Sequence, residues 1–136
     1  MGLLIDSSVL IAAERGRIRL QSVLAGNEDE SLAISVVTAS ELLYGIYRAK
    51  TVEQAERRRQ FVNFVLALFP IIPIDLEVAH HHARIWAGLQ TRGEMIGPYD
   101  LMIAASALAS GYKVVTFNVD EFTRVPGLQV VTPIRQ

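Results

Sequence analysis

Short apolar runs alternate along the chain with longer segments in which apolar residues recur at helical spacing. Unbroken apolar runs of this kind are typical of strands buried on both faces. They occupy residues 2–6, 32–36, 71–75, 113–117 and 128–132. The segments with helical spacing lie at 7–16, 19–26, 38–50, 51–70, 76–93 and 98–110. This alternation predicts an α/β fold with a central, mainly parallel sheet flanked by helices.

Glycine, proline and capping residues mark the boundaries of these elements. Pro73 cannot donate to a sheet ladder, so the strand at 71–75 is expected at an edge. Asp75 is placed to cap the helix at 76–93, and Gly93 to end it. No internal repeat, linker or low-complexity tract interrupts residues 1–136, which predicts a single domain.

Composition narrows the class of protein. Hydrophobic residues make up 51% and charged residues 20% of the chain, which argues against disorder. The absence of cysteine excludes disulfides and thiolate metal sites. With no signal-peptide pattern and no apolar run of roughly 18 residues, we expect a soluble cytoplasmic protein without a membrane span. The net charge of −1 gives no overall support for nucleic-acid binding, but it leaves room for a local basic surface.

Several acidic side chains fall at predicted strand ends or helix starts. Asp6 ends the first strand, Glu41 follows the second, and Asp100 lies in the first turn of the buried helix at 98–110. Asn118 and Asp120 follow the strand at 113–117. Ligand sites in open α/β sheets form outside the carboxyl ends of the strands. We therefore expect these side chains to share one edge of the sheet.

Carboxylates gathered in this way repel one another. At about 4 Å and an effective dielectric constant of about 20, a pair of like charges costs roughly 4 kcal/mol. Protons or a cation must neutralise such a cluster. All-oxygen ligands suit Mg²⁺ or Mn²⁺, and carboxylate-held Mg²⁺ is common in phosphoryl chemistry.

Each acid also has a structural interpretation. Asp6 could cap the helix that starts at Ser7, and Glu41 could complete a capping box with Thr38 in "TASE". Asp100 could complement the helix dipole after the Gly97–Pro98 start. A helix-start acid can be held by the backbone and still face a cation, so both interpretations stay open.

Three segments together resemble the PIN domain, specifically the VapC type of toxin–antitoxin ribonuclease. They are "LLIDSSVLI", "SVVTASELLYGI" and "IGPYDLMIAASALASGYKVVTFNVDEFTRVPGLQVVTP". The resemblance implies a PIN-like three-layer α/β/α fold and an endoribonuclease dependent on Mg²⁺ or Mn²⁺. It also implies a VapB-like antitoxin partner, and we expect a homodimer.

Carried over by position, the resemblance makes Asp6, Glu41 and Asp100 the metal ligands and Asn118 a fourth catalytic position. Many PIN domains have aspartate where this chain has Asn118, and Asp120 could compensate or could simply begin a turn. The Thr116 or Ser7 hydroxyl could orient a metal-bound water.

Basic residues supply candidate contacts to RNA, with solvated surface as the alternative. Arg57 and Arg58 lie in "ERRRQ", and Arg124 lies near the Asn118 loop. Two other functions stay open: a catalytically silent PIN scaffold that binds RNA or protein, and a phosphoacceptor receiver domain. The receiver domain fits less well, because it expects adjacent acids after the first strand, where this chain reads "IDSS".

Overall fold

The computed structural model describes residues 2–133 and contains a parallel sheet of five strands. The strand order is β3-β2-β1-β4-β5, and every neighbouring pair is parallel. The strands are β1 (Gly2–Ile5), β2 (Ser31–Ser35), β3 (Ile71–Ile72), β4 (Tyr112–Val115) and β5 (Val130–Val131). All five predicted strands are confirmed, and β3 lies at an edge as expected. Both edge strands are shorter than predicted, and at β3 Pro73 cannot extend the ladder.

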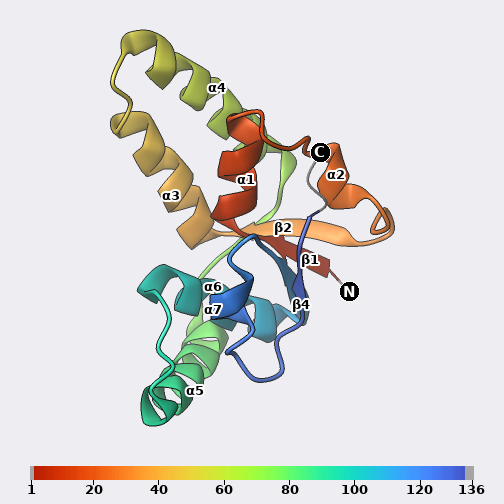
Figure 1. Ribbon diagram of the computed structural model, residues 1–136, viewed down its shortest axis with the longest axis vertical. Coiled ribbons are helices and arrows are strands. Elements are labelled where there is room, and N and C mark those ends of the chain that lie inside the picture. Colours follow the sequence, from red (N-terminus) through yellow and green to blue (C-terminus); the bar gives the residue numbers. More distant parts are fainter. Residues whose placement is uncertain (1, 134–136) are drawn as a thin grey trace.

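Helices cover both faces of the sheet, which confirms the three-layer fold (Figure 1). Four helices pack on one face: α1 (Ser7–Glu14), α2 (Gln21–Leu24), α3 (Val36–Tyr47) and α4 (Val52–Leu68). Three pack on the other: α5 (Leu76–Arg92), α6 (Pro98–Ser110) and α7 (Val119–Phe122). None of the helices within residues 2–133 is both long and apolar enough to cross a bilayer.

Successive residues of β1 supply the two apolar cores. Leu3 and Ile5 belong to the core beneath α1–α4, whereas Leu4 belongs to the core beneath α5–α7. Strand side chains alternate between faces, so a strand covered on both sides must be apolar at every position. This requirement explains the unbroken apolar run from which the strand was predicted.

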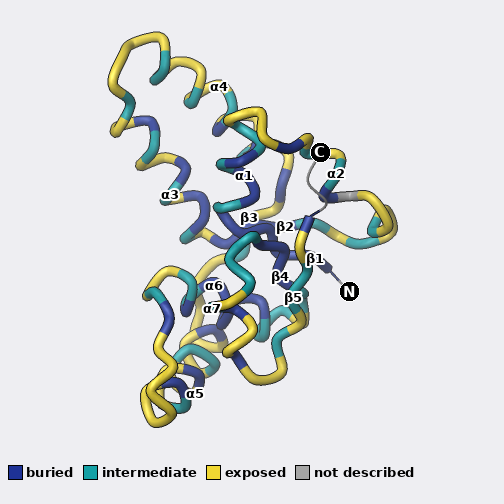
Figure 2. Tube along the Cα trace, viewed as in Figure 1, coloured by how far each residue is buried: buried dark blue, intermediate teal, exposed yellow. Residues whose placement is uncertain are grey.

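The helices α3 and α4 form a hairpin that extends away from the sheet (Figure 1). Its outer part is largely exposed, and its burial increases toward the sheet (Figure 2). Near the sheet, Ala39, Leu42, Val62 and Val65 enter the core. The hairpin is therefore anchored mainly at its base, and in its outer half Ile46 also enters the core.

Local capping moves the start of α3 from the predicted residue 38 to Val36. The Ser35 side chain caps the helix by accepting a hydrogen bond from the Val37 backbone N–H at 3.1 Å. The capping-box interpretation of Thr38 and Glu41 is therefore wrong. The predicted caps of α5 are confirmed, because Asp75 Oδ1 accepts from Val78 N–H at 3.0 Å and Gly93 ends the helix at a φ of +68°.

Candidate active site

The central strands β1 and β4 end side by side, at the point where the chain order in the sheet reverses. From β1 the chain builds β2 and β3 on one side, then returns to place β4 and β5 on the other. The Asp6 backbone N–H donates to Val115 O at 2.9 Å, which brings Asp6 beside Thr116. Ligands bind α/β sheets at such switch points. A ligand site is therefore expected at this edge of the sheet.

The Asp6 carboxylate is buried and only half satisfied. The residue is 2% exposed, and its Oδ2 accepts hydrogen bonds from the hydroxyls of Ser8 and Thr116, each at 2.8 Å. Its Oδ1 is buried and has no hydrogen-bond partner among residues 2–133. Asp6 occupies the N-cap position of α1, but its side chain makes no capping hydrogen bond. Helix capping therefore does not account for the presence of a carboxylate at position 6.

Glu41 points toward the same edge from the second turn of α3. Its Oε1 accepts a hydrogen bond from the Ser7 hydroxyl at 3.0 Å. Burial raises the pKa of Glu41, the charge of Asp6 raises it further, and the bond from Ser7 opposes the rise. Asp6 and Glu41 therefore lie close enough to repel each other.

Asp100 and Glu121 share the side-chain amide of Asn118. Asn118 Nδ2 donates to Asp100 Oδ2 at 2.7 Å and also to Glu121 Oε2. Burial raises the pKa of Asp100 to about 8, with further contributions from a hydrogen bond with Glu121 and from the charges of Asp6 and Glu121. Hydrogen bonds, first of all with Asp100, lower the pKa of Glu121. Within this pair the pKa is therefore raised at Asp100 and lowered at Glu121.

The structure brings Asp6, Glu41, Asp100 and Asn118 to one edge, as the sequence predicted. The charge of Asp6 acts on both Glu41 and Asp100. In the arrangement described for residues 2–133, however, no three acidic or histidine side chains are gathered closely enough to hold one ion. The acids approach one another in pairs.

Two residues of the site, Ser8 and Glu121, were not predicted from the sequence. Ser8 bonds to Asp6 and also accepts from the Phe117 backbone N–H at 3.1 Å, so it joins β1 to the end of β4. Glu121 takes the position proposed for Asp120, which is exposed. The residue spacing held a signal: in "NVDEF", Asn118 is the N-cap of α7 and Glu121 lies three residues later, and residues three apart on a helix share a face.

The hydroxyls of Thr116 and Ser7 donate to carboxylates in this structure, whereas the sequence suggested a bond to water. Thr116 Oγ1 donates to Asp6 Oδ2 and accepts from the Asn118 backbone N–H, each at 2.8 Å. Ser7 Oγ donates to Glu41. Both hydroxyls therefore fix the orientation of acids.

The donor set fits a hard divalent cation. It offers only carboxylate and amide oxygens, which Mg²⁺ and Mn²⁺ prefer. A buried carboxylate oxygen without a partner is costly, and a cation would satisfy Asp6 Oδ1. A cation would also relieve the repulsion that contributes to the raised pKa values of Glu41 and Asp100.

A cleft of about 570 Å³ runs from Glu41 along α1, α3 and α4. Three cations on this cleft are not paired with any carboxylate in the described part of the chain: Arg15, Arg48 and Lys50. The exposed aromatic rings of Tyr44 and Tyr99 also line it. The cleft is therefore basic although the whole chain is slightly acidic.

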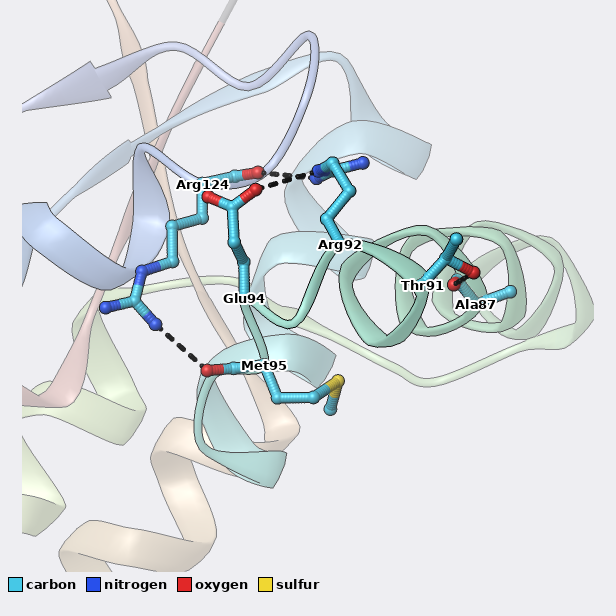
Figure 3. Close-up of polar contacts among 6 residues, drawn as sticks. All are labelled: Ala87, Thr91, Arg92, Glu94, Met95 and Arg124. Atoms are coloured by element: carbon cyan, nitrogen blue, oxygen red, sulfur yellow. Dashed lines mark hydrogen bonds and ion pairs between the residues drawn. The ribbon is translucent and has the colours of Figure 1, made fainter.

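The arginines predicted to contact RNA fall in different environments. Arg57 is exposed and lines a neighbouring cavity of about 310 Å³. Arg58 pairs with Glu14 at 3.5 Å and donates to Gly45 O at 2.6 Å, so it links α4 to α1 and α3. Arg124 donates from Nη1 to Met95 O at 3.0 Å, beyond the end of α5 (Figure 3). The contacts of Arg58 and Arg124 indicate structural roles.

Comparison with known proteins agrees with this geometry. The family model of the PIN domain matches residues 3–128. "Ribonuclease VapC" of Rickettsia bellii is 36% identical over 132 residues, which cover 97% of this chain and 96% of the relative. "tRNA(fMet)-specific endonuclease VapC" of Salmonella typhimurium is 35% identical over 99 residues, or 73% of each chain.

Solved structures give the same assignment. VapBC2 from Rickettsia felis, bound to a DNA fragment from its promoter, matches with a TM-score of 0.85 at 26% identity and covers 97% of this chain and 98% of that one. DNA-bound VapBC from Salmonella typhimurium also matches with a TM-score of 0.85, at 29% identity and with the same coverage. The chain therefore belongs to the PIN-domain family and is a PIN domain of the VapC type.

Proposed function

We propose that this protein is a metal-dependent endoribonuclease that acts as the toxin of a toxin–antitoxin pair. The observation that carries the proposal is the buried, unpartnered Oδ1 of Asp6 at the edge where the Glu41 and Asp100 carboxylates also arrive. The name of the relative from Rickettsia bellii supports the ribonuclease activity. Because the chain is a PIN domain, the receiver-domain alternative is excluded.

Asp6, Glu41 and Asp100 would hold Mg²⁺ or Mn²⁺. When bound, the ion would lower the pKa of a coordinated water and stabilise negative charge on the phosphate oxygens. Because the three carboxylates are not gathered around one point in this structure, we expect their rotamers to change on binding.

The residues around these acids prepare them for that role. Thr116 and Ser8 occupy Oδ2 of Asp6 and leave Oδ1 available. Ser7 orients Glu41, and the Asn118 amide orients Asp100. Asn118 carries no charge, so in this proposal it positions a ligand while the carboxylates supply the negative charge.

The basic cleft would bind the RNA strand next to the site. Cations line its walls and Glu41 lies at its edge, so a strand held by its phosphates on Arg15, Arg48 and Lys50 would pass the acids. Tyr44 and Tyr99 are exposed rings on which bases can stack. Phosphate contacts carry little base information, so the target sequence must be selected elsewhere.

We also propose a VapB-like antitoxin partner and a homodimer. The VapBC complexes from Rickettsia felis and Salmonella typhimurium support the antitoxin. An apolar groove of about 400 Å³ between the sheet, α2 and α4 is available for an apolar segment of such a partner, with Phe64 and Leu68 both 53% exposed beside it. The homodimer remains a prediction that sedimentation of the isolated protein would test.

Cleavage assays on the Asp6→Asn and Asp100→Asn variants test the proposed activity. The wild type should cleave single-stranded RNA with Mg²⁺ or Mn²⁺ and stop in EDTA, whereas both variants should bind RNA without cleaving it. Glu53→Gln, in the first turn of α4, is the matched control and should cleave normally. Wild-type binding without cleavage in either metal would instead favour the silent scaffold. Full cleavage by both variants would disprove the site.

A further inference from the structure

We propose that Arg124 is a positioning residue for the Asp100 ligand, acting through the loop of residues 93–97 that connects α5 to α6. This inference rests on the proposed nuclease function and assigns Arg124 a role in the site in place of an RNA contact. The loop decides where α6 begins, and Asp100 lies in the first turn of that helix. A shift of the loop would therefore move a metal ligand.

Arg124 and Arg92 cross-link the loop to the segment after α7 (Figure 3). Arg124 Nη1 donates to Met95 O at 3.0 Å, and Arg92 Nη2 donates to Arg124 O at 3.2 Å. Arg92 also pairs with Glu94 through Nε, at 3.0 Å. The two bonds that involve Arg124 run in opposite directions, one to the loop and the other from Arg92 at the end of α5. Together they hold the middle of the loop.

Glu121 holds the end of the same loop from inside the site. Its Oε1 accepts from the Gly97 backbone N–H at 3.2 Å, and Gly97 is the N-cap of α6. Its Oε2 accepts from Asn118, which also bonds to Asp100. The short segment from Asn118 to Arg124 therefore contacts the loop at two points and Asp100 itself at a third.

The surroundings of Arg124 fit this role better than phosphate binding. The positive charge of Arg124 lowers the pKa of the neighbouring Glu121 carboxyl group. Arg124 therefore already interacts with an acid of the site. The unpaired cations of the basic cleft directly follow the ends of α1 and α3, whereas α7 packs on the opposite face of the sheet. Mutation of the residues that orient metal ligands typically lowers metal affinity or activity by about 10- to 100-fold.

The experiment compares Arg124→Ala with Arg59→Ala in the full-length protein. Arg59 is an exposed α4 arginine whose ion pair with Glu56 lies outside the site, so its loss changes the net charge equally. Three quantities are measured for each: Mn²⁺ affinity by calorimetry, exchange of the Gly97 amide, and RNA cleavage separated into kcat and KM. Arg124→Lys, which keeps the charge and one donor to Met95 O, serves as the rescue variant.

We expect Arg124→Ala to weaken Mn²⁺ binding by about tenfold or more, to speed Gly97 exchange and to lower kcat with little change in KM. Arg124→Lys should recover part of each loss, and Arg59→Ala should match the wild type. Because Arg124 is exposed, we expect the variant to fold, and a thermal melt checks this. A raised KM with unchanged Mn²⁺ affinity and exchange would show an RNA contact and overturn the proposal. So would wild-type values throughout.

If the wild type binds Mn²⁺ but cleaves no RNA, the nuclease proposal fails, while the metal affinity and amide exchange still decide the role of Arg124. The two failures are therefore distinguishable.

Discussion

At the scale of single residues, hydroxyl groups organise the acids of the site. Ser7, Ser8 and Thr116 each donate to a carboxylate, and none of these bonds is part of a helix or a strand ladder. A hydroxyl satisfies an acid without neutralising it, so negative charge is retained at the sheet edge. Burial first, and then the charge of Asp6, raises the pKa of both Glu41 and Asp100.

The pKa of Asp100 makes stability depend on pH. Burial and neighbouring acids raise it to about 8, from an ordinary value of 3.8. The folded chain therefore binds this proton more tightly than the unfolded chain, and the free energy of unfolding falls as pH rises between these values. The Asp100→Asn variant has no carboxyl group at this position, so this fall in the free energy of unfolding should be absent from it. We expect the Tm of the variant, relative to wild type, to rise from pH 5 to pH 9.

Thermal melts in EDTA measure this difference, with Glu53→Gln as the control. The lowered pKa of Glu121 acts in the opposite sense, but only at more acidic pH. The raised pKa of Glu41 acts in both proteins and cancels in the comparison, so the difference reports on Asp100. Parallel Tm curves for Asp100→Asn and wild type across that window would contradict the assignment.

At the scale of elements, a hydrogen bond and an ion pair from one arginine connect the α3–α4 hairpin to α1. Arg58 reaches from α4 to Gly45 O in α3 and to Glu14 in α1. Its side chain is 20% exposed, so these contacts are mostly shielded from water. One arginine thus fixes the spacing of the three helices that border the basic cleft.

Arg58→Met should lower the free energy of unfolding by about 1–3 kcal/mol, because it leaves Gly45 O and the Glu14 carboxylate without this partner. Arg57→Met, one position away and exposed, should change it by no more than about 0.5 kcal/mol. Urea denaturation of both variants gives the comparison. Equal stabilities would show that Arg58 is not a structural tie.

The sequence predicted every strand and all the longer helices. Strands buried on both faces are unbroken apolar runs, and helices buried on one face carry apolar residues at helical spacing. It also predicted the acids of the edge, since strand ends and helix starts can be located along the chain. It did not predict the Ser35 cap, the Ser8 bond to Asp6 or the role of Glu121, which depend on tertiary contacts or rotamers. The ion pair of Arg58 with Glu14 was not predicted for the same reason, because the two residues are far apart in sequence.

At the scale of the whole molecule, acidic and basic side chains occupy different regions, which the net charge of −1 does not show. Acids concentrate at the carboxyl edge of the sheet, while Arg15, Arg48 and Lys50 line the adjoining cleft. In the proposed function, this separation would place an anionic polymer next to the metal ligands without making the protein basic overall.

The salt dependence of RNA binding tests this arrangement. In an Asp6→Asn background that binds without cleaving, three phosphate contacts predict that log K falls with log salt at a slope of about −2, at roughly 0.7 per phosphate on a single strand. Alanine at Arg15, Arg48 or Lys50 should make the slope shallower by about 0.7 each. Arg59→Ala should leave it unchanged. Equal slopes in all variants would place the RNA elsewhere.

The pairing of β1 with β4 has a consequence for how the protein is made. Asp6 and Thr116 are 110 residues apart in sequence, yet they share a hydrogen bond just beyond the carboxyl ends of the two central strands. Contacts of such long sequence separation are costly in chain entropy and cannot form until most of the polypeptide is available. During synthesis, the ribosome therefore releases β4 only after nearly all other elements exist. A growing chain would therefore carry Asp6 without its Thr116 partner until β4 has emerged, so the edge of the sheet cannot assemble before then.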